Sequence, residues 1–154
     1  MRLTQRGGLL ALSLPCFALV GAALVSQHVF DMQPCPWCIL QRIIFLVIAL
    51  LLLAGAFLPG RAVFIVGSVA FALAGITTAL YQHFVAAKSS SCNLTLADKI
   101  ISGLGLDKAV PAMFEVRASC ADAAVDMLHV PYEFWSLGFF VVVAVAATYT
   151  LSRR

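Results

Sequence analysis

Long apolar stretches alternate with shorter polar segments along the chain. A helix needs about 20 mostly apolar residues to cross a bilayer. Four stretches meet this requirement, at residues 9–27, 39–58, 62–87 and 134–151. The pattern therefore predicts an all-α membrane protein, a bundle of four transmembrane helices.

The polar segments differ greatly in length. The sequence LPGR at 58–61 is short, so the second and third spans form a tight helical hairpin. The other two connections are loops over residues 28–38 and 88–133. The longer loop carries an apolar stripe at helical spacing, which predicts a short amphipathic helix: Leu96, Ile100, Ile101 and Leu104. This helix could lie in the membrane interface or pack on the bundle as a small core helix.

Composition supports a single membrane domain. Of the 154 residues, 62% are hydrophobic and only 11% are charged, which excludes an ordinary soluble domain. No low-complexity linker or internal repeat divides the chain. We therefore expect one domain over residues 1–154.

The distribution of charge predicts the orientation. The arginines at both termini and in the 58–61 turn flank one side of the spans, whereas all seven acidic residues fall on the other side. By the positive-inside rule, the termini and the 58–61 turn are cytoplasmic and loops 28–38 and 88–133 face outward. The first span could instead be a cleaved signal peptide, because Arg2 and Arg6 precede it and the small residues GAA follow at 21–23. Cleavage would leave the orientation of the other spans unchanged.

Four of the five cysteines lie in the outward loops or at their edges: Cys35, Cys38, Cys92 and Cys120. Thiols in an oxidising compartment are expected to pair, so these cysteines could form two structural disulfides. They could also bind zinc, but 27 residues separate the second pair, instead of the usual two to four. The fifth, Cys16, lies among apolar residues of the first span, and we assign it no role.

Three features favour a redox pair at Cys35 and Cys38. A Cys-x-x-Cys closes a very small loop and is more often reactive than structural. Pro36 suits the first turn of a helix, so Cys35 is predicted at its N-cap, where the helix dipole favours a thiolate. Arg42 follows Cys38 by four residues and so shares its helix face. Arg42 could be an interfacial residue whose head group reaches water, but a cation beside a potential thiolate favours a functional role.

The chain resembles the disulfide bond formation protein B (DsbB) family of bacterial inner-membrane thiol oxidases. The resemblance rests on the four spans, on PCPWCILQR at 34–42, on two separated cysteines in the second outward loop, and on WSLGFF at 135–140. It covers essentially the whole chain.

The resemblance implies a mechanism and a set of site residues. Cys35–Cys38 would be the disulfide next to a membrane quinone (ubiquinone or menaquinone). Cys92–Cys120 would face a periplasmic DsbA-like oxidase, with exchange through a Cys35–Cys120 bond. Arg42 and His83 would support the quinone. Gln41 stands where some relatives carry an acid, which puts an acid–base role there in doubt.

The resemblance also implies a location in the bacterial inner membrane, with periplasmic cysteine loops. We expect a monomer with no metal and no nucleic-acid partner. Two other functions are open at this point. The chain could be a DsbB-like paralogue that serves a dedicated partner, or a non-enzymatic four-span protein with structural disulfides or a bound metal.

Overall fold

The computed structural model describes residues 2–88, 95–124 and 126–152. Four long helices form the body of the protein: α1 (Arg2–Val29), α2 (Pro36–Phe57), α3 (Arg61–Phe84) and α7 (Tyr132–Ser152). Each contains or closely matches one predicted apolar stretch, and all four are long and apolar enough to cross a membrane. The four-span prediction is confirmed.

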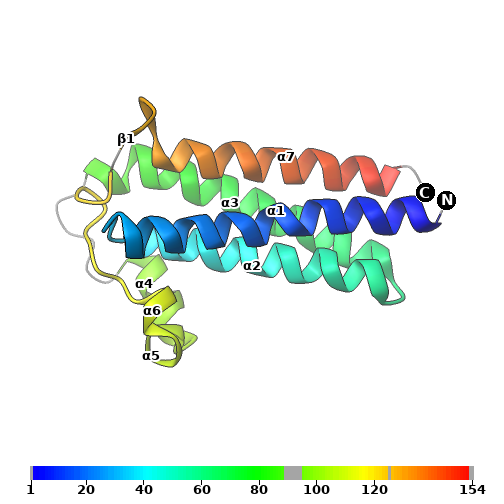
Figure 1. The fold of residues 1–154 in the computed structure, drawn as a ribbon, viewed down its shortest axis with the longest axis horizontal. Helices are drawn as coiled ribbons and strands as arrows, with labels where there is room; N and C mark the ends of the chain where they lie inside the picture. The colour runs from blue at the N-terminus through cyan, green and yellow to red at the C-terminus, as the bar shows by residue number, and fades with distance from the viewer. Residues whose placement is uncertain (1, 89–94, 125, 153–154) are drawn as a thin grey trace.

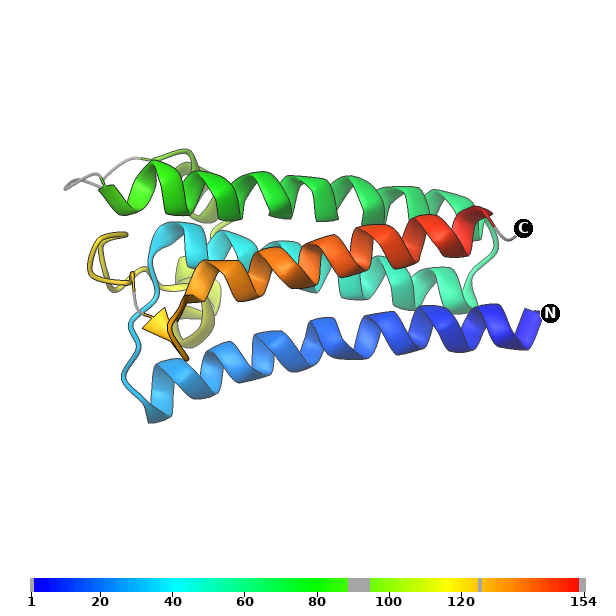
Figure 2. The ribbon, with the colours of Figure 1, turned by 90° about the horizontal axis from the view of Figure 1, so that it is seen from above.

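The helices run alternately up and down, so the two cysteine loops meet at one end (Figures 1 and 2). Both termini and the turn between α2 and α3 lie at the opposite end. Gly60 in this turn has φ +80°, a left-handed conformation that glycine adopts without steric cost. The tight hairpin predicted at residues 58–61 is therefore present.

Close helix packing depends on a small residue opposite a large ring. A Cβ on Gly75 of α3 would lie 2.5 Å from the ring of Phe140 on α7. Phe140 in turn stacks on Phe45 of α2, with ring centroids 4.0 Å apart. The glycine thus lets α7 approach α3 while Phe140 reaches the centre of the bundle.

The second loop forms short elements beside the start of α2 (Figure 1). A 3-10 turn, η1 (Ala86–Lys88), follows α3, and the loop then forms α4 (Leu96–Gly103), α5 (Leu106–Ala109) and α6 (Pro111–Phe114). A two-stranded antiparallel hairpin, β1 (Asp126–Met127) and β2 (Val130–Pro131), leads into α7.

Helix α4 is the predicted short amphipathic helix. A reciprocal capping box between Thr95 and Asp98 starts it. Ile101 is buried against Ile39 of α2, but Leu96 remains 64% exposed. The apolar stripe is therefore divided, with one part packed on the bundle and the other free to face a membrane interface.

Candidate dithiol site and cavity

The Cys-x-x-Cys lies at the start of α2. Cys35 is the N-cap and Pro36 the first helical residue, as the sequence predicts. The backbone N–H of Cys38 donates to Cys35 Sγ at 3.3 Å. The two sulfur atoms are 2.8 Å apart, so a small adjustment would bring them to bonding distance.

Cys120 of the second loop joins this pair. It is buried in the same apolar cluster as Cys35 and is hydrogen-bonded to it. The loop is held there by Pro34, whose carbonyl accepts from Arg117 N at 3.1 Å and Ala118 N at 3.2 Å. Three sulfur atoms therefore meet at the end of the bundle, from residues 85 positions apart in sequence. Cys92 lies outside the described residues.

One electrostatic expectation is wrong. The helix dipole was expected to favour a thiolate at Cys35. Instead, hydrogen bonds with Cys120 and Cys38, together with burial, raise the pKa of the Cys35 thiol well above its usual range. Burial removes the water that would stabilise the anion, and the adjacent thiols disfavour a second charge. When reduced, Cys35 is held as a thiol.

Arg42 is buried, with 7% of its surface exposed. Its Nη1 donates to Gln27 Oε1 at 2.6 Å and to Met113 O at 3.1 Å. Its Nη2 donates to Ala23 O at 3.3 Å. The side chain thus points into the bundle rather than out to the membrane surface, which argues against the interfacial interpretation.

A cavity of about 200 Å³ opens beside the dithiol, between α1, α2 and α7. Cys38 and Arg42 both line it, and most of the rest of its wall is apolar, including Phe45 and Phe139. Gln33 also lines it, and its buried Oε1 has no hydrogen-bond partner within the described part of the chain. The cavity thus offers a sulfur atom and a cation to a flat, mainly apolar ligand.

Sequence reasoning missed a pair of buried amides at this site. Gln82 Nε2 donates to Cys38 Sγ at 3.3 Å, and Gln41 Nε2 donates to Gln82 Oε1 at 2.7 Å. Gln41 and Gln82 also line the cavity. Glutamine at both positions orients a hydrogen-bond donor toward Cys38. Their shared site could not be read from sequence because they lie on different helices.

His83 has a different environment from the one expected. Its Nδ1 lies 2.6 Å from Oε1 of Glu133, a buried residue in the first turn of α7. His83 is not among the residues that line the cavity. Its assignment to a quinone stays a prediction, and the structure adds Glu133 as its partner.

The remaining cysteine and the two other histidines, Cys16, His28 and His129, are not among the residues that line the cavity. Cys16 is buried within α1 and its Sγ donates to Leu12 O at 3.4 Å. His129 lies in the turn of the β1–β2 hairpin, with φ +64°. His28 contacts the backbone of the second loop, with its Nε2 3.0 Å from Ala112 O.

The fold and the site define a multi-pass membrane protein with a buried dithiol that contacts a loop cysteine. The family model of the disulfide bond formation protein DsbB matches residues 5–150. Disulfide bond formation protein B 1 of Pseudomonas syringae pv. syringae is 37% identical over 150 residues, covering 95% of this chain and 89% of the relative.

Two further relatives agree. Disulfide bond formation protein B of Nitrosospira multiformis is 32% identical, with 97% of this chain and 92% of the relative covered. Disulfide bond formation protein B 1 of Pseudomonas fluorescens Pf0-1 is 36% identical, with 97% and 91% covered. The chain belongs to the DsbB family, and its class of activity is disulfide oxidoreduction in a membrane.

Proposed function

We propose that the protein reoxidises a periplasmic DsbA-like dithiol oxidase and passes the electrons to a membrane quinone. The observation that carries this proposal is a continuous path of reactive atoms. Cys120 of the loop contacts Cys35, Cys35 Sγ lies 2.8 Å from Cys38 Sγ, and Cys38 lines the cavity. The path leads from the aqueous loop to a mainly apolar site in the bundle.

The exchange steps follow from this order. A thiolate of the soluble partner attacks Cys92 of the Cys92–Cys120 disulfide and releases Cys120. The Cys120 thiolate attacks Cys35 Sγ, which forms a Cys35–Cys120 bond, breaks Cys35–Cys38 and releases Cys38 as a thiolate. Arg42 and the Gln82 amide stabilise this leaving anion. The partner's second thiol then displaces Cys92, and the partner leaves with its disulfide formed. The Cys92 thiolate attacks Cys120, which restores Cys92–Cys120 and leaves Cys35 and Cys38 as a dithiol. This dithiol would pass its two electrons and two protons to a bound quinone, which restores Cys35–Cys38.

The cavity fits a quinone head group by its chemistry. Its aromatic and aliphatic wall suits an apolar ring, whereas Arg42 can donate to a ring oxygen. A bound quinone would supply a two-electron acceptor soluble in the bilayer.

Such an acceptor is needed on energetic grounds. A DsbA-like oxidase has a reduction potential of about −120 mV. An ordinary disulfide, with a potential of about −200 mV, is too weak an oxidant to reoxidise it. The difference of roughly 80 mV over two electrons makes this reoxidation unfavourable by about 4 kcal/mol. Coupling the sulfur pair to a quinone removes this deficit.

The proposed orientation follows from the arginines. We assign the end with the termini and the α2–α3 turn to the cytoplasm of a bacterial cell, and the dithiol end to the periplasm. The chain then acts as one domain in the inner membrane.

Purified protein, a soluble ubiquinone and a reduced DsbA-like partner test the function. We expect one quinone to be reduced, by absorbance, for each partner disulfide formed. Cys38→Ser should abolish the reaction and Cys16→Ala should preserve it, because only Cys38 lines the cavity. Repeated turnover of the partner in Cys38→Ser or without quinone, beyond the disulfides that the protein itself carries, would contradict the proposal.

A further inference from the structure

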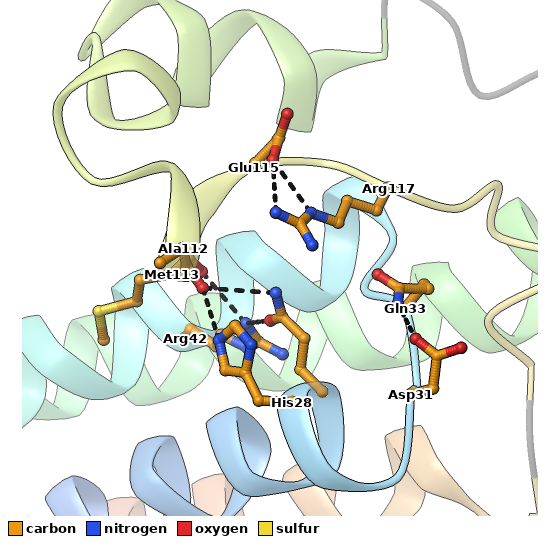
Figure 3. Close-up of polar contacts among 9 residues, drawn as sticks. His28, Asp31, Gln33, Arg42, Ala112, Met113, Glu115 and Arg117 are labelled. Atoms are coloured by element: carbon orange, nitrogen blue, oxygen red, sulfur yellow. Dashed lines mark hydrogen bonds and ion pairs between the residues drawn. The ribbon is translucent and has the colours of Figure 1, made fainter.

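A set of side chains from α1 and α2 binds the backbone of α6. His28 Nε2 contacts Ala112 O at 3.0 Å, and Arg42 Nη1 donates to Met113 O at 3.1 Å (Figure 3). Gln27 links these contacts, since its Oε1 accepts from Arg42 at 2.6 Å and its Nε2 donates to Ala112 O at 3.4 Å. We call Gln27, His28 and Arg42 the α6 clamp.

The clamp binds carbonyl groups that need partners. The last carbonyls of a helix have no N–H donor within the helix. In α6, Pro111 O accepts from Glu115 N, whereas Ala112 O and Met113 O accept from the clamp. Side chains near a helix C-terminus often provide such caps, but here they come from other helices.

The clamp lies on the approach to Cys120. Five residues separate Cys120 from the end of α6 at Phe114, which packs in a buried cluster with Ile39 and Ile101. Between them, Arg117 N and Ala118 N bind Pro34 O, immediately before Cys35. The α6 contacts therefore hold one part of this segment against α1 and α2, and the Pro34 contacts hold the other part against the loop between these helices.

We propose that Gln27 and His28 are positioning residues that hold the Cys120 segment against Cys35 through α6. This proposal rests on the proposed function, because it concerns the Cys35–Cys120 exchange. Fixing two reacting groups beside each other raises their effective concentration. The clamp would therefore favour the state in which the loop is docked and the Cys35–Cys120 bond can form over the state in which the loop is partly detached.

Gln27 and His28 allow a cleaner test than Arg42. Arg42 lines the cavity, so its replacement changes the cavity as well as the loop. Gln27 and His28 do not line the cavity. Because Gln27 also accepts from Arg42, the His28 variants separate loop positioning most clearly from any effect on a cavity ligand.

The test uses the full chain with Cys16→Ala, Cys38→Ser and Cys92→Ser, which leaves only Cys35 and Cys120. The protein is equilibrated in thiol–disulfide buffers without quinone, quenched with acid and tagged with a mass-shifting maleimide. The fraction oxidised gives the equilibrium constant of the Cys35–Cys120 disulfide. This readout does not depend on turnover.

We expect Gln27→Met to lower this constant by about tenfold, the effect of losing one or two buried hydrogen bonds. Gln27→Glu should lower it as well, because a carboxylate can bind Arg42 but cannot donate to Ala112 O. His28→Phe should lower it severalfold, and His28→Gln should restore it because the amide keeps an N–H donor. A general loss of structure would not be rescued in this way.

Gln5→Met is the matched control. Gln5 accepts from Arg61 Nη1 at 2.6 Å, the same type of contact at the opposite end of the bundle. It should leave the constant within about twofold. Helix content measured by circular dichroism identifies variants that fail to fold.

The outcomes separate the two proposals. If the parent forms the disulfide and Gln27→Met and His28→Phe leave its constant unchanged, the positioning role is overturned and the proposed function stands. If the parent does not form the disulfide even in oxidising buffer, both the clamp and the proposed exchange are wrong.

Discussion

Replacing Arg42 by glutamine tests the most unusual residue of the site. The substitution removes a buried positive charge from the cavity wall and the donors to Gln27, Met113 and Ala23. The polar side chain that remains is shorter and neutral. We expect a large loss of quinone-dependent turnover.

The magnitude follows from the position of Arg42 on the helix. Side chains four residues apart on one helix face start about 6 Å apart at their Cβ atoms. A thiolate and a guanidinium at about this distance, at an effective dielectric constant of about 20, attract by about 3 kcal/mol. Loss of this attraction to the Cys38 anion, or to negative charge on a ligand, corresponds to a roughly hundredfold decrease in the turnover rate.

The assay separates two half-reactions. Steady-state quinone reduction should fall by about a hundredfold in Arg42→Gln, and the quinone concentration for half-maximal rate should rise. Transfer from preoxidised Cys92–Cys120 to reduced partner, in a single turnover, should be preserved because it takes place in the loop. Arg42→Lys should be intermediate at best, since an ammonium group lacks the planar fork of donors.

Arg61→Gln is the control, because Arg61 donates to Gly55 O and to Gln5 Oε1 at the other end of the bundle. It should leave quinone dependence unchanged. Arg42 does not have the assigned role if Arg42→Gln shows normal quinone dependence, or if the single-turnover transfer falls as far as the steady-state rate.

Three further predictions concern topology, packing and pH. In intact cells, an impermeant maleimide should label a cysteine introduced at exposed Ser102 but not one introduced at exposed Pro59. The reverse pattern would show that the orientation is the opposite of the proposed one. Gly75→Ala should destabilise the protein by about 1–3 kcal/mol, seen as a lower melting temperature, because the added Cβ would overlap an aromatic ring of α7. Gly21→Ala is the control and should leave the melting temperature unchanged, because a Cβ there would meet no atom within 4 Å. The reduced protein should lose stability as pH rises above about 8.5, the usual pKa of a cysteine thiol. The pKa of Cys35 is raised in the folded state, so the folded protein holds the thiol proton more tightly than the unfolded chain does. The melting temperature of Cys35→Ala should therefore fall less over this pH range, and an equal fall would contradict the raised pKa of Cys35.

Much of the architecture could be predicted from local sequence patterns. Continuous apolar stretches determine the helices, because the backbone of a spanning segment must satisfy its own hydrogen bonds in the bilayer. The N-cap at Cys35 and the helical position of Pro36 depend only on neighbouring residues, and the structure confirms both. The shared helix face of Cys38 and Arg42 also follows from helix geometry alone.

The ionisation of Cys35 could not be predicted in this way. The neighbouring residues indicate only a helix start, whose dipole favours an anion at the N-terminus. Tertiary packing buries the thiol and places Cys120 beside it, and these effects prevail. The residue responsible lies 85 positions away, outside any local pattern.

Tertiary structure also decided what surrounds Cys38 and Arg42. Hydropathy shows that a segment spans the membrane, but it does not fix the rotation of each helix or its neighbours. The rotation and the neighbours of each helix depend on packing. Packing brings Gln82 to Cys38 and Gln27 to Arg42 from other helices. The sequence by itself therefore determined four spans and a dithiol at a helix start, whereas the cavity and the polar contacts around it arise only when the helices pack, because each is built from side chains of separate segments.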